Sequence, residues 1–107
     1  MQESKNKDEN LNEIQSNEES YQLKLFIAGA SENSLRAIEN IKAFSKNSLD
    51  NKVNLEIIDI YQQPMLAEQE QIIALPLLIK KYPLPERRFI GDLSDINILL
   101  KGMGINS

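Results

Sequence analysis

The sequence predicts one small α/β domain, and three observations support this prediction. The chain has 107 residues, of which 41% are hydrophobic and 26% are charged, which suits a single compact core. Apolar residues alternate in some segments and recur every three or four residues in others, so strands and helices follow one another along the chain. The first 20 residues lack both patterns. The predicted domain therefore begins at residue 21.

The leader over residues 1–20 is polar apart from Met1, Leu11 and Ile14. It contains six acids and two bases, so it carries the whole formal net charge of −4. Such a segment cannot bury enough apolar surface to offset the entropy cost of ordering. We predict a disordered acidic leader over residues 1–20, a domain over 21–104 and a short tail over 105–107.

The first half of the domain reads as strand, helix and strand. Apolar residues alternate over 21–28, and a second strand is expected over 53–60. Its final stretch, residues 57–60, is nearly continuous in β-branched residues, as in a strand that is covered on both faces. Between them we expect a helix that is capped by Ser31 or Asn33 and ends near residues 47–48. Its predicted buried stripe consists of Leu35, Ala37, Ile38, Ile41 and Phe44. This order predicts a right-handed βαβ unit with parallel strands.

The second half reads as helix, hairpin and helix. Pro64 suits a first helical turn, with Leu66, Ile72 and Ile73 buried and residues 68–71 facing water. Strands over 77–82 and 87–90 flank a turn at 83–85. A last helix, capped by Ser94 or Asp92 and ended by Gly102, carries Ile96, Leu99 and Leu100. The resulting order, βαβαββα in a single domain, is the thioredoxin-like arrangement.

The chain contains neither cysteine nor histidine, which excludes thiol chemistry, zinc sites and imidazole catalysis. Ser31 or Ser34 stands where thioredoxin-like enzymes carry a redox cysteine, and helix capping is the role we expect for either serine. The domain has ten acids and ten bases, a balance that does not suggest nucleic-acid binding. No apolar run suits a membrane span or a signal peptide, so we expect a cytoplasmic protein. Because the chain also lacks a D-x-D or EF-hand spacing, we expect no metal or cofactor. The thioredoxin-like context favours a cis bond between Leu75 and Pro76.

Several strings resemble the KaiB family in order and spacing. Residues 23–29 read LKLFIAG and residues 33–37 read NSLRA, where KaiB proteins usually have LKLYVAG and NSxRA. The match continues through residues 58–60, 64–68, 74–76 and 83–94, so it covers about residues 21–104. Each string is weak alone, but their combination is specific.

The resemblance implies a non-enzymatic regulatory protein with two alternative folds. KaiB proteins form tetramers in one fold; in the other they are thioredoxin-like monomers that bind the N-terminal ATPase ring of KaiC. That complex can sequester KaiA and displace a KaiB-like sensor kinase. The implied partner-contact residues are Arg36, Ala67, Glu68, Gln71, Arg87 and Arg88. The implied switch or structural residues are Pro76, Gly91, Asp92, Gly102 and Gly104.

The sequence also departs from the clock-type pattern. Residues 102–104 read Gly-Met-Gly in place of the usual Gly-Leu-Asp, and the apolar and acidic tail is missing. Both departures predict that the thioredoxin-like form is favoured over the tetramer fold. Gln71 stands where a lysine is usual, which fits a KaiB–KaiC stress-response pair better than a circadian oscillator. Self-association as a dimer or tetramer stays open, with Leu84, Phe89 and Met103 as expected exposed apolar residues.

Three alternatives compete with KaiC binding. The first is a stand-alone thioredoxin-like adaptor or stress protein with a different protein partner and no redox activity. The second is a glutathione-binding protein, which the absence of cysteine does not by itself eliminate. The third is a sensory domain like the N-terminal part of KaiB-like histidine kinases, although here no coiled-coil or kinase segment follows the domain.

Overall fold

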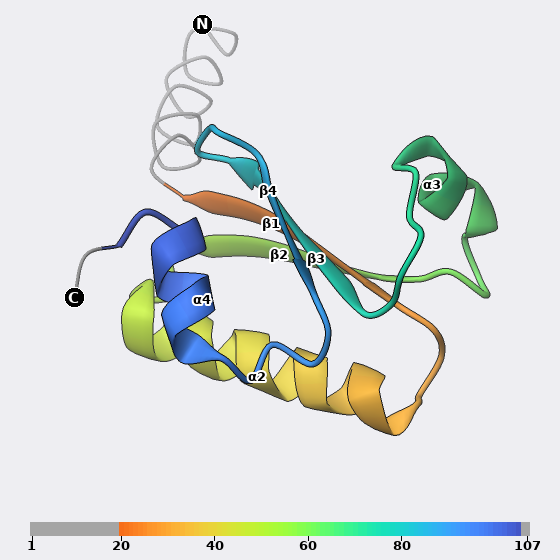
Figure 1. The fold of residues 1–107 in the computed structure, drawn as a ribbon, viewed down its shortest axis with the longest axis horizontal. Helices are drawn as coiled ribbons and strands as arrows, with labels where there is room; N and C mark the ends of the chain where they lie inside the picture. The colour runs from red at the N-terminus through yellow and green to blue at the C-terminus, as the bar shows by residue number, and fades with distance from the viewer. Residues whose placement is uncertain (1–19, 106–107) are drawn as a thin grey trace, which may run out of the picture.

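The computed structural model describes residues 20–105, and its elements follow the predicted order (Figure 1). The elements are β1 (Tyr21–Ile27), α2 (Glu32–Ser48), β2 (Val53–Asp59), α3 (Pro64–Gln69), β3 (Leu77–Tyr82), β4 (Arg87–Ile90) and α4 (Ile96–Gly102). The four strands form one sheet in the order β2-β1-β3-β4, in which β1 and β2 are parallel and the other pairs are antiparallel. The predicted thioredoxin-like arrangement is thereby confirmed. The predicted leader, up to residue 19, and residues 106–107 lie outside the described residues.

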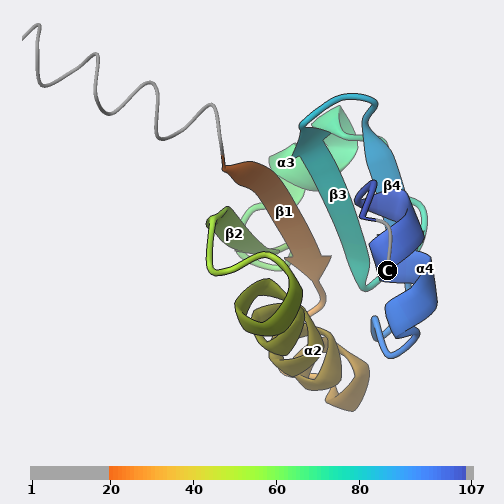
Figure 2. The same cartoon turned by 90° about the vertical axis from the view of Figure 1, so that its left-hand side faces the viewer.

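Helices cover both faces of the sheet, but unequally. α2 and α4 lie against one face and α3 lies on the other (Figures 1 and 2). The larger core, between the sheet and α2 and α4, is built from Leu23, Leu25, Ile27, Ala37, Ile41, Phe44, Leu49, Leu78, Phe89, Leu93, Leu99 and Met103. The smaller core, on the α3 face, consists of Phe26, Ile58, Leu77 and Ile79. The α3 face therefore leaves room for polar side chains on the sheet.

One of the two predicted caps of α2 is confirmed, and one residue of the predicted buried stripe is wrong. The Ser31 hydroxyl accepts a hydrogen bond from the Ser34 backbone nitrogen at 3.2 Å. Leu35 is exposed, because a strict three-residue repeat drifts around a helix by about 60° at each step. The buried residues Ser34, Ala37, Ile41, Phe44 and Ser45 instead follow the helical period.

Two further predictions on the parallel pair and on α3 are corrected. β2 is an edge strand, and its residue Ile57 is exposed. The prediction that both faces of this strand are buried is therefore wrong at Ile57. α3 ends at Gln69, before the predicted Ile72 and Ile73. Gln71 has a φ of 57°, a left-handed conformation that turns the chain out of the helix. As a result Ile72 packs against the smaller core, whereas Ile73 is exposed.

The cap of α4 is also corrected. It is Asp95, whose carboxylate accepts hydrogen bonds from the backbone nitrogens of Asn97 and Ile98, rather than Ser94 or Asp92. Asp92 instead accepts a hydrogen bond from the Ser94 nitrogen, within the loop before the helix. Either carboxylate can satisfy free backbone donors, so the sequence does not distinguish between them.

Of the three apolar residues expected at the surface, only Leu84 is exposed. Phe89 and Met103 are buried in the larger core, because α4 folds over β4. Gly102 packs directly against the Phe89 ring, where a Cβ would overlap Cε2 and Cζ. The Leu75–Pro76 bond is cis, as expected. Within residues 20–105 no helix is long and apolar enough to cross a membrane.

Candidate partner-binding surface

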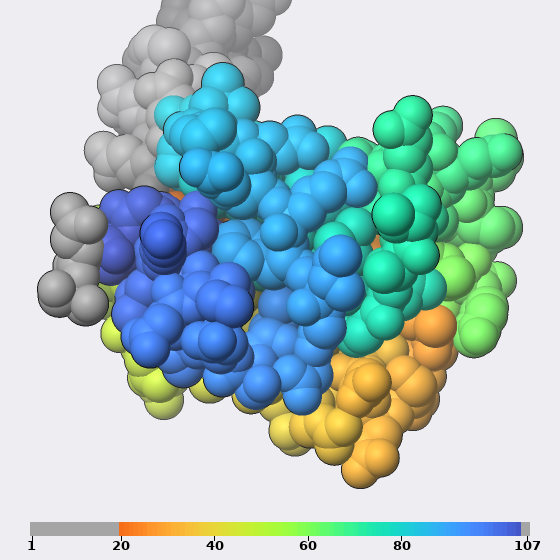
Figure 3. Space-filling model, viewed as in Figure 1, coloured from red at the N-terminus to blue at the C-terminus, as the bar shows by residue number. Residues whose placement is uncertain are grey.

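The segment that contains α3 exposes large apolar side chains. Tyr61, Met65 and Ile73 are 73%, 68% and 95% exposed. Glu68 and Gln71 are exposed on the same segment, and Ala67 is half-buried. Figure 3 shows this segment, coloured green, projecting at one end of the domain. We call the exposed residues Tyr61, Met65, Glu68, Gln71 and Ile73 the α3 surface, because several large apolar side chains exposed on one segment indicate an interaction site.

Asp59 fixes the point where this segment leaves the sheet. Its Oδ1 accepts hydrogen bonds from the backbone nitrogens of Gly29 at 3.1 Å and Tyr61 at 2.9 Å. Gly29 has a φ of 62°, which favours glycine, and a Cβ there would lie 3.3 Å from the Tyr61 ring. The loop after β1 and the start of the α3 segment are therefore held together.

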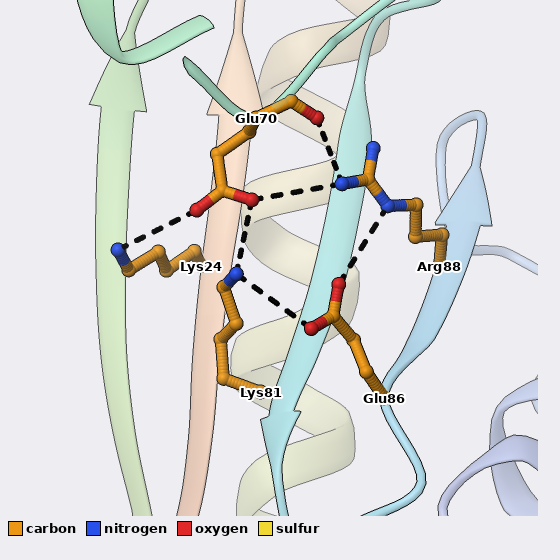
Figure 4. Close-up of polar contacts among 5 residues, drawn as sticks. All are labelled: Lys24, Glu70, Lys81, Glu86 and Arg88. Carbon is orange, nitrogen blue, oxygen red and sulfur yellow. Dashed lines mark hydrogen bonds and ion pairs between the residues drawn. The ribbon is translucent and has the colours of Figure 1, made fainter.

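An ion cluster holds the other end of the α3 segment to the sheet (Figure 4). At its centre Glu70 accepts a hydrogen bond from Lys81 Nζ at 2.9 Å and lies 3.6 Å from Arg88 Nη2 and 4.0 Å from Lys24 Nζ. Arg88 also donates to the Glu70 backbone oxygen at 2.8 Å. Glu86 completes the cluster, 3.7 Å from Lys81 and 3.9 Å from Arg88. Three strands thus contact one carboxylate at the end of α3.

Glu70→Gln is expected to lower the free energy of unfolding by about 1 kcal/mol at low ionic strength, since the cluster is partly screened by solvent. The substitution leaves Lys24, Lys81 and Arg88 close together without their shared anion. Thermal unfolding in 20 mM and 1 M NaCl measures the effect, which should shrink at high salt. Glu68→Gln is the matched control, because Glu68 makes no ion pair within residues 20–105. Equal unfolding temperatures for the two variants would contradict a structural role for the cluster.

Arg36 lies on the opposite layer, in α2. Its guanidinium contacts Glu32 at 3.1 Å, Asn33 at 2.7 Å and Asp92 at 3.4 Å. Asn40, also in α2, donates to the Asp92 backbone oxygen at 2.8 Å. Hydrogen bonds from Ser94, and secondarily Arg36, lower the pKa of the Asp92 carboxyl. Arg36 therefore ties the loop before α4 to α2, although much of its side chain stays exposed.

Arg87 and Arg88 point to opposite faces of the sheet, because successive side chains of a strand alternate. Arg88 joins the ion cluster on the α3 face, whereas Arg87 pairs with Lys80 across the strands on the α4 face. The six implied contact residues therefore do not form one patch. Ala67, Glu68, Gln71 and Arg88 belong to the α3 side, while Arg36 and Arg87 lie on the other side.

Lys80 is an unusual lysine, with only 3% of its surface exposed. It pairs with no carboxylate of the described part of the chain. Burial, and secondarily the charge of Arg87, lower the pKa of the Lys80 ammonium below its usual 10.5. The folded state thus carries an unfavourable charge at neutral pH.

Lys80→Met is expected to raise the unfolding temperature, because methionine fills a similar volume without a charge that burial disfavours. In the parent chain, the destabilisation caused by burying the Lys80 ammonium is fully present at pH values below the pKa of Lys80 in the folded state. It disappears as the pH rises to 10.5, the pKa of the lysine in the unfolded chain. The difference between variant and parent should therefore narrow over that interval. Chemical denaturation at pH 7 and pH 10 measures both stabilities. A variant that is less stable than the parent at pH 7 would contradict this account.

Of the five implied switch or structural residues, one precedes β4 in the sequence and four follow it. Pro76 is buried and its carbonyl accepts a hydrogen bond from the Gly91 nitrogen at 2.9 Å. Gly91 and Gly104 have φ values of 108° and 77°. Asp92 and Gly102 make the contacts described above. Their part in fold switching stays a prediction.

Comparison with known proteins identifies the family. The KaiB domain model matches residues 24–105. The chain belongs to the KaiB family. It is 44% identical over 85 residues to the circadian clock oscillator protein KaiB of Prochlorococcus marinus (strain MED4), covering 79% of each chain. It is 42% identical to the KaiB of Synechococcus elongatus (strain PCC 7942), covering 79% of this chain and 83% of the relative.

Solved structures agree with the fold of this KaiB-family chain. The N-terminal domain of Synechococcus elongatus SasA is 26% identical, with a TM-score of 0.59, and the similarity covers 79% of this chain and 84% of that domain. Chloroplastic thioredoxin z is 19% identical with a TM-score of 0.63, covering 90% of this chain and 89% of the other, which shows a shared fold alone.

The ion cluster of this KaiB-family member is not predicted from the sequence. Glu70 was expected to face water with its neighbours, but it is the acid that contacts both β3 and β4. The available signal was the alternation of the strands, which places Lys24, Lys81 and Arg88 on one face. Tyr61 and Met65 were missed because single exposed apolar residues give no periodic pattern.

Proposed function

We propose that this KaiB-family chain is a regulatory binding protein whose partner is a KaiC-like ATPase ring. The observation that carries the proposal is the α3 surface, which exposes Tyr61, Met65 and Ile73 beside Glu68 and Gln71. The curated relatives are named circadian clock oscillator proteins, which supports a role in clock output; control of a stress response is the alternative output.

The composition of the α3 surface suits a protein partner. Interfaces typically combine an apolar centre with a polar rim and are enriched in tyrosine and methionine. Asp59 and the ion cluster hold both ends of the segment, which reduces the entropy that binding would cost. A pre-positioned segment of this kind favours a stable complex.

The loop at the start of α2 supports binding rather than thiol redox chemistry. A small pocket beside Pro76 is lined by Ser31, Glu32, Asn33 and Ser34, together with Ala28 and Leu75. The serine hydroxyls hydrogen-bond each other at 2.8 Å and Ser34 is buried. Ser31 caps α2, whereas the Ser34 hydroxyl accepts a hydrogen bond from the Ala28 backbone nitrogen at 3.3 Å rather than capping the helix. No cysteine exists in the chain to form a disulfide.

Size-exclusion chromatography with light scattering tests the proposal. The full chain is run alone, with a KaiC-type ATPase from the same source, and with that ATPase plus ATP. We expect the chain to elute with the ring in at least one nucleotide state. Two folded proteins that stay separate at tens of micromolar would contradict KaiC binding and favour the alternative, a thioredoxin-like adaptor with a different partner.

A further inference from the structure

The outer edge of β4 pairs with no strand of residues 20–105. β4 is the last strand in the order β2-β1-β3-β4, and Figure 2 shows it at the margin of the sheet beside α4. The Gly91 nitrogen donates to the Pro76 oxygen at 2.9 Å, and this pair continues the register of β3 and β4. Bonded and non-bonded pairs alternate along an antiparallel ladder. Arg88 and Ile90 therefore direct their backbone N–H and C=O groups to the open edge.

A groove between β4 and α4 runs beside this edge. One cavity of about 290 Å³ is lined by residues 88–95 together with Ile98 and Leu99. A second cavity, also of about 290 Å³, is lined by Arg87, Arg88, Phe89, Ile98, Lys101 and Gly102. The two cavities share three of these residues and so adjoin each other. The open backbone thus borders a space that can receive the side chains of an added strand.

Apolar side chains are exposed on both sides of the open edge. Ile90 lies on the same face of the sheet as Arg88, because side chains of a strand alternate between faces. Ile98 lies on the other side, in α4, and both isoleucines are exposed. Side chains of an added strand alternate in the same way. Such a strand places one side chain against Ile90 and the next against Ile98.

Charges of opposite sign occupy the two ends of the groove. Arg87 and Lys101 line the end beside the start of β4, and neither forms an ion pair within residues 20–105. Asp92 and Asp95 line the end beyond β4. An occupant that complements the groove therefore carries its acidic residues beside the start of β4.

The charges favour an acidic strand over a second copy of β4. Two copies of β4 that paired edge to edge would bring Arg87 and Arg88 of both chains together, and like charges on paired strands oppose pairing. Charged side chains on edge strands commonly prevent such self-pairing. An acidic strand instead meets Arg87 and Lys101 with opposite charge, which gives specificity and speeds association.

We infer that the outer edge of β4 binds an extended, acidic segment of a partner protein as an added strand. The segment runs antiparallel to β4 and exchanges backbone hydrogen bonds with Arg88 and Ile90. Its acidic residues lie near its C-terminal end, beside Arg87 and Lys101 and away from the two carboxylates of the groove. The inference does not depend on the proposed ATPase ring, for which the α3 surface is the proposed contact.

Chemical-shift titration of the ¹⁵N-labelled full chain with synthetic peptides tests the inference. The probe is the capped peptide TVTVTEDE, whose β-branched residues favour an extended strand and whose acids lie at its C-terminal end. We expect saturable shifts over residues 87–91 and 96–102, and none over residues 61–73. A second peptide has two adjacent central residues replaced by proline, which keeps the charge but removes backbone donors. It should bind at least tenfold more weakly.

Arg87→Gln with Lys101→Gln should weaken binding of the probe at least fivefold at 50 mM NaCl, because both unpaired cations are lost. Lys42→Gln with Lys46→Gln is the matched control, since both lysines are exposed on α2 and the change in net charge is equal. The control should bind the probe within twofold of the parent. Thermal unfolding shows whether both variants keep the fold.

Four results would overturn the inference. One is the absence of shifts over residues 87–91 at 1 mM probe. Another is equal affinity for the proline peptide, which would show attraction between charges without strand pairing. The third is an equal loss of affinity in the groove variant and the α2 control. The fourth is a set of shifts over residues 87–91 that depends on protein concentration without peptide, which would assign the edge to a second copy.

Discussion

Gly102→Ala is expected to lower the free energy of unfolding by about 2 kcal/mol, or roughly 10 °C in the unfolding temperature. Gly102 lies at the end of α4, where an added Cβ would overlap the Phe89 ring. Phe89 is buried between β4 and α4 and has little room to move. The clash should exceed the gain of about 1 kcal/mol that alanine normally brings to a helix over glycine. Urea denaturation followed by circular dichroism measures the change.

The Phe89→Leu background provides the control for this clash. A smaller side chain leaves space for the new methyl group, so the double variant should lose less stability than the sum of the two single variants. Lys101→Ala changes an exposed residue of the same helix and should stay close to the parent. Additive losses, or a Gly102→Ala chain as stable as the parent, would show that α4 does not pack on β4 in this way.

Met65→Asp is expected to weaken binding to a KaiC-like ATPase ring at least tenfold, which corresponds to about 1.4 kcal/mol. Met65 is exposed in α3, so the substitution should leave the fold intact while it buries a charge in the proposed apolar contact. Fluorescence anisotropy of the labelled full chain, titrated with the ring, gives the dissociation constant. Thermal unfolding of the variant confirms that the fold is retained.

Leu84→Asp is the matched control for the binding measurement. Leu84 is 75% exposed in the turn between β3 and β4, which lies at the other end of the molecule from α3 in Figure 1. It should bind within twofold of the parent. The same loss in both variants would indicate a general effect of added charge rather than a contact made by α3.

The fold was predictable because most elements carry their own local signal. The alternation over β1, the cap at Ser31 and the proline at the start of α3 are each within a few residues of what they determine. The errors occur where tertiary packing decides. The end of α3 depends on the left-handed conformation of Gln71, and the burial of Phe89 depends on where α4 folds.

The candidate site was less predictable for the same physical reason. Arg87 and Arg88 are adjacent in sequence, yet they serve opposite faces of the sheet. Glu70 looks like its solvated neighbours until β3 and β4 bring Lys81 and Arg88 beside it. A run of charged residues does not by itself show which ion-pair partners the side chains have or on which face of the sheet they lie. Both depend on the register of the strands.

Hydrogen–deuterium exchange of the full chain, alone and with a KaiC-like ATPase ring, tests most directly whether the α3 surface is the binding site. We predict that the ring slows exchange over residues 61–74, with a smaller effect on α2 and on the β3–β4 turn. A complex whose protection is confined to α2 or to the groove between β4 and α4, with no change over residues 61–74, would contradict the account.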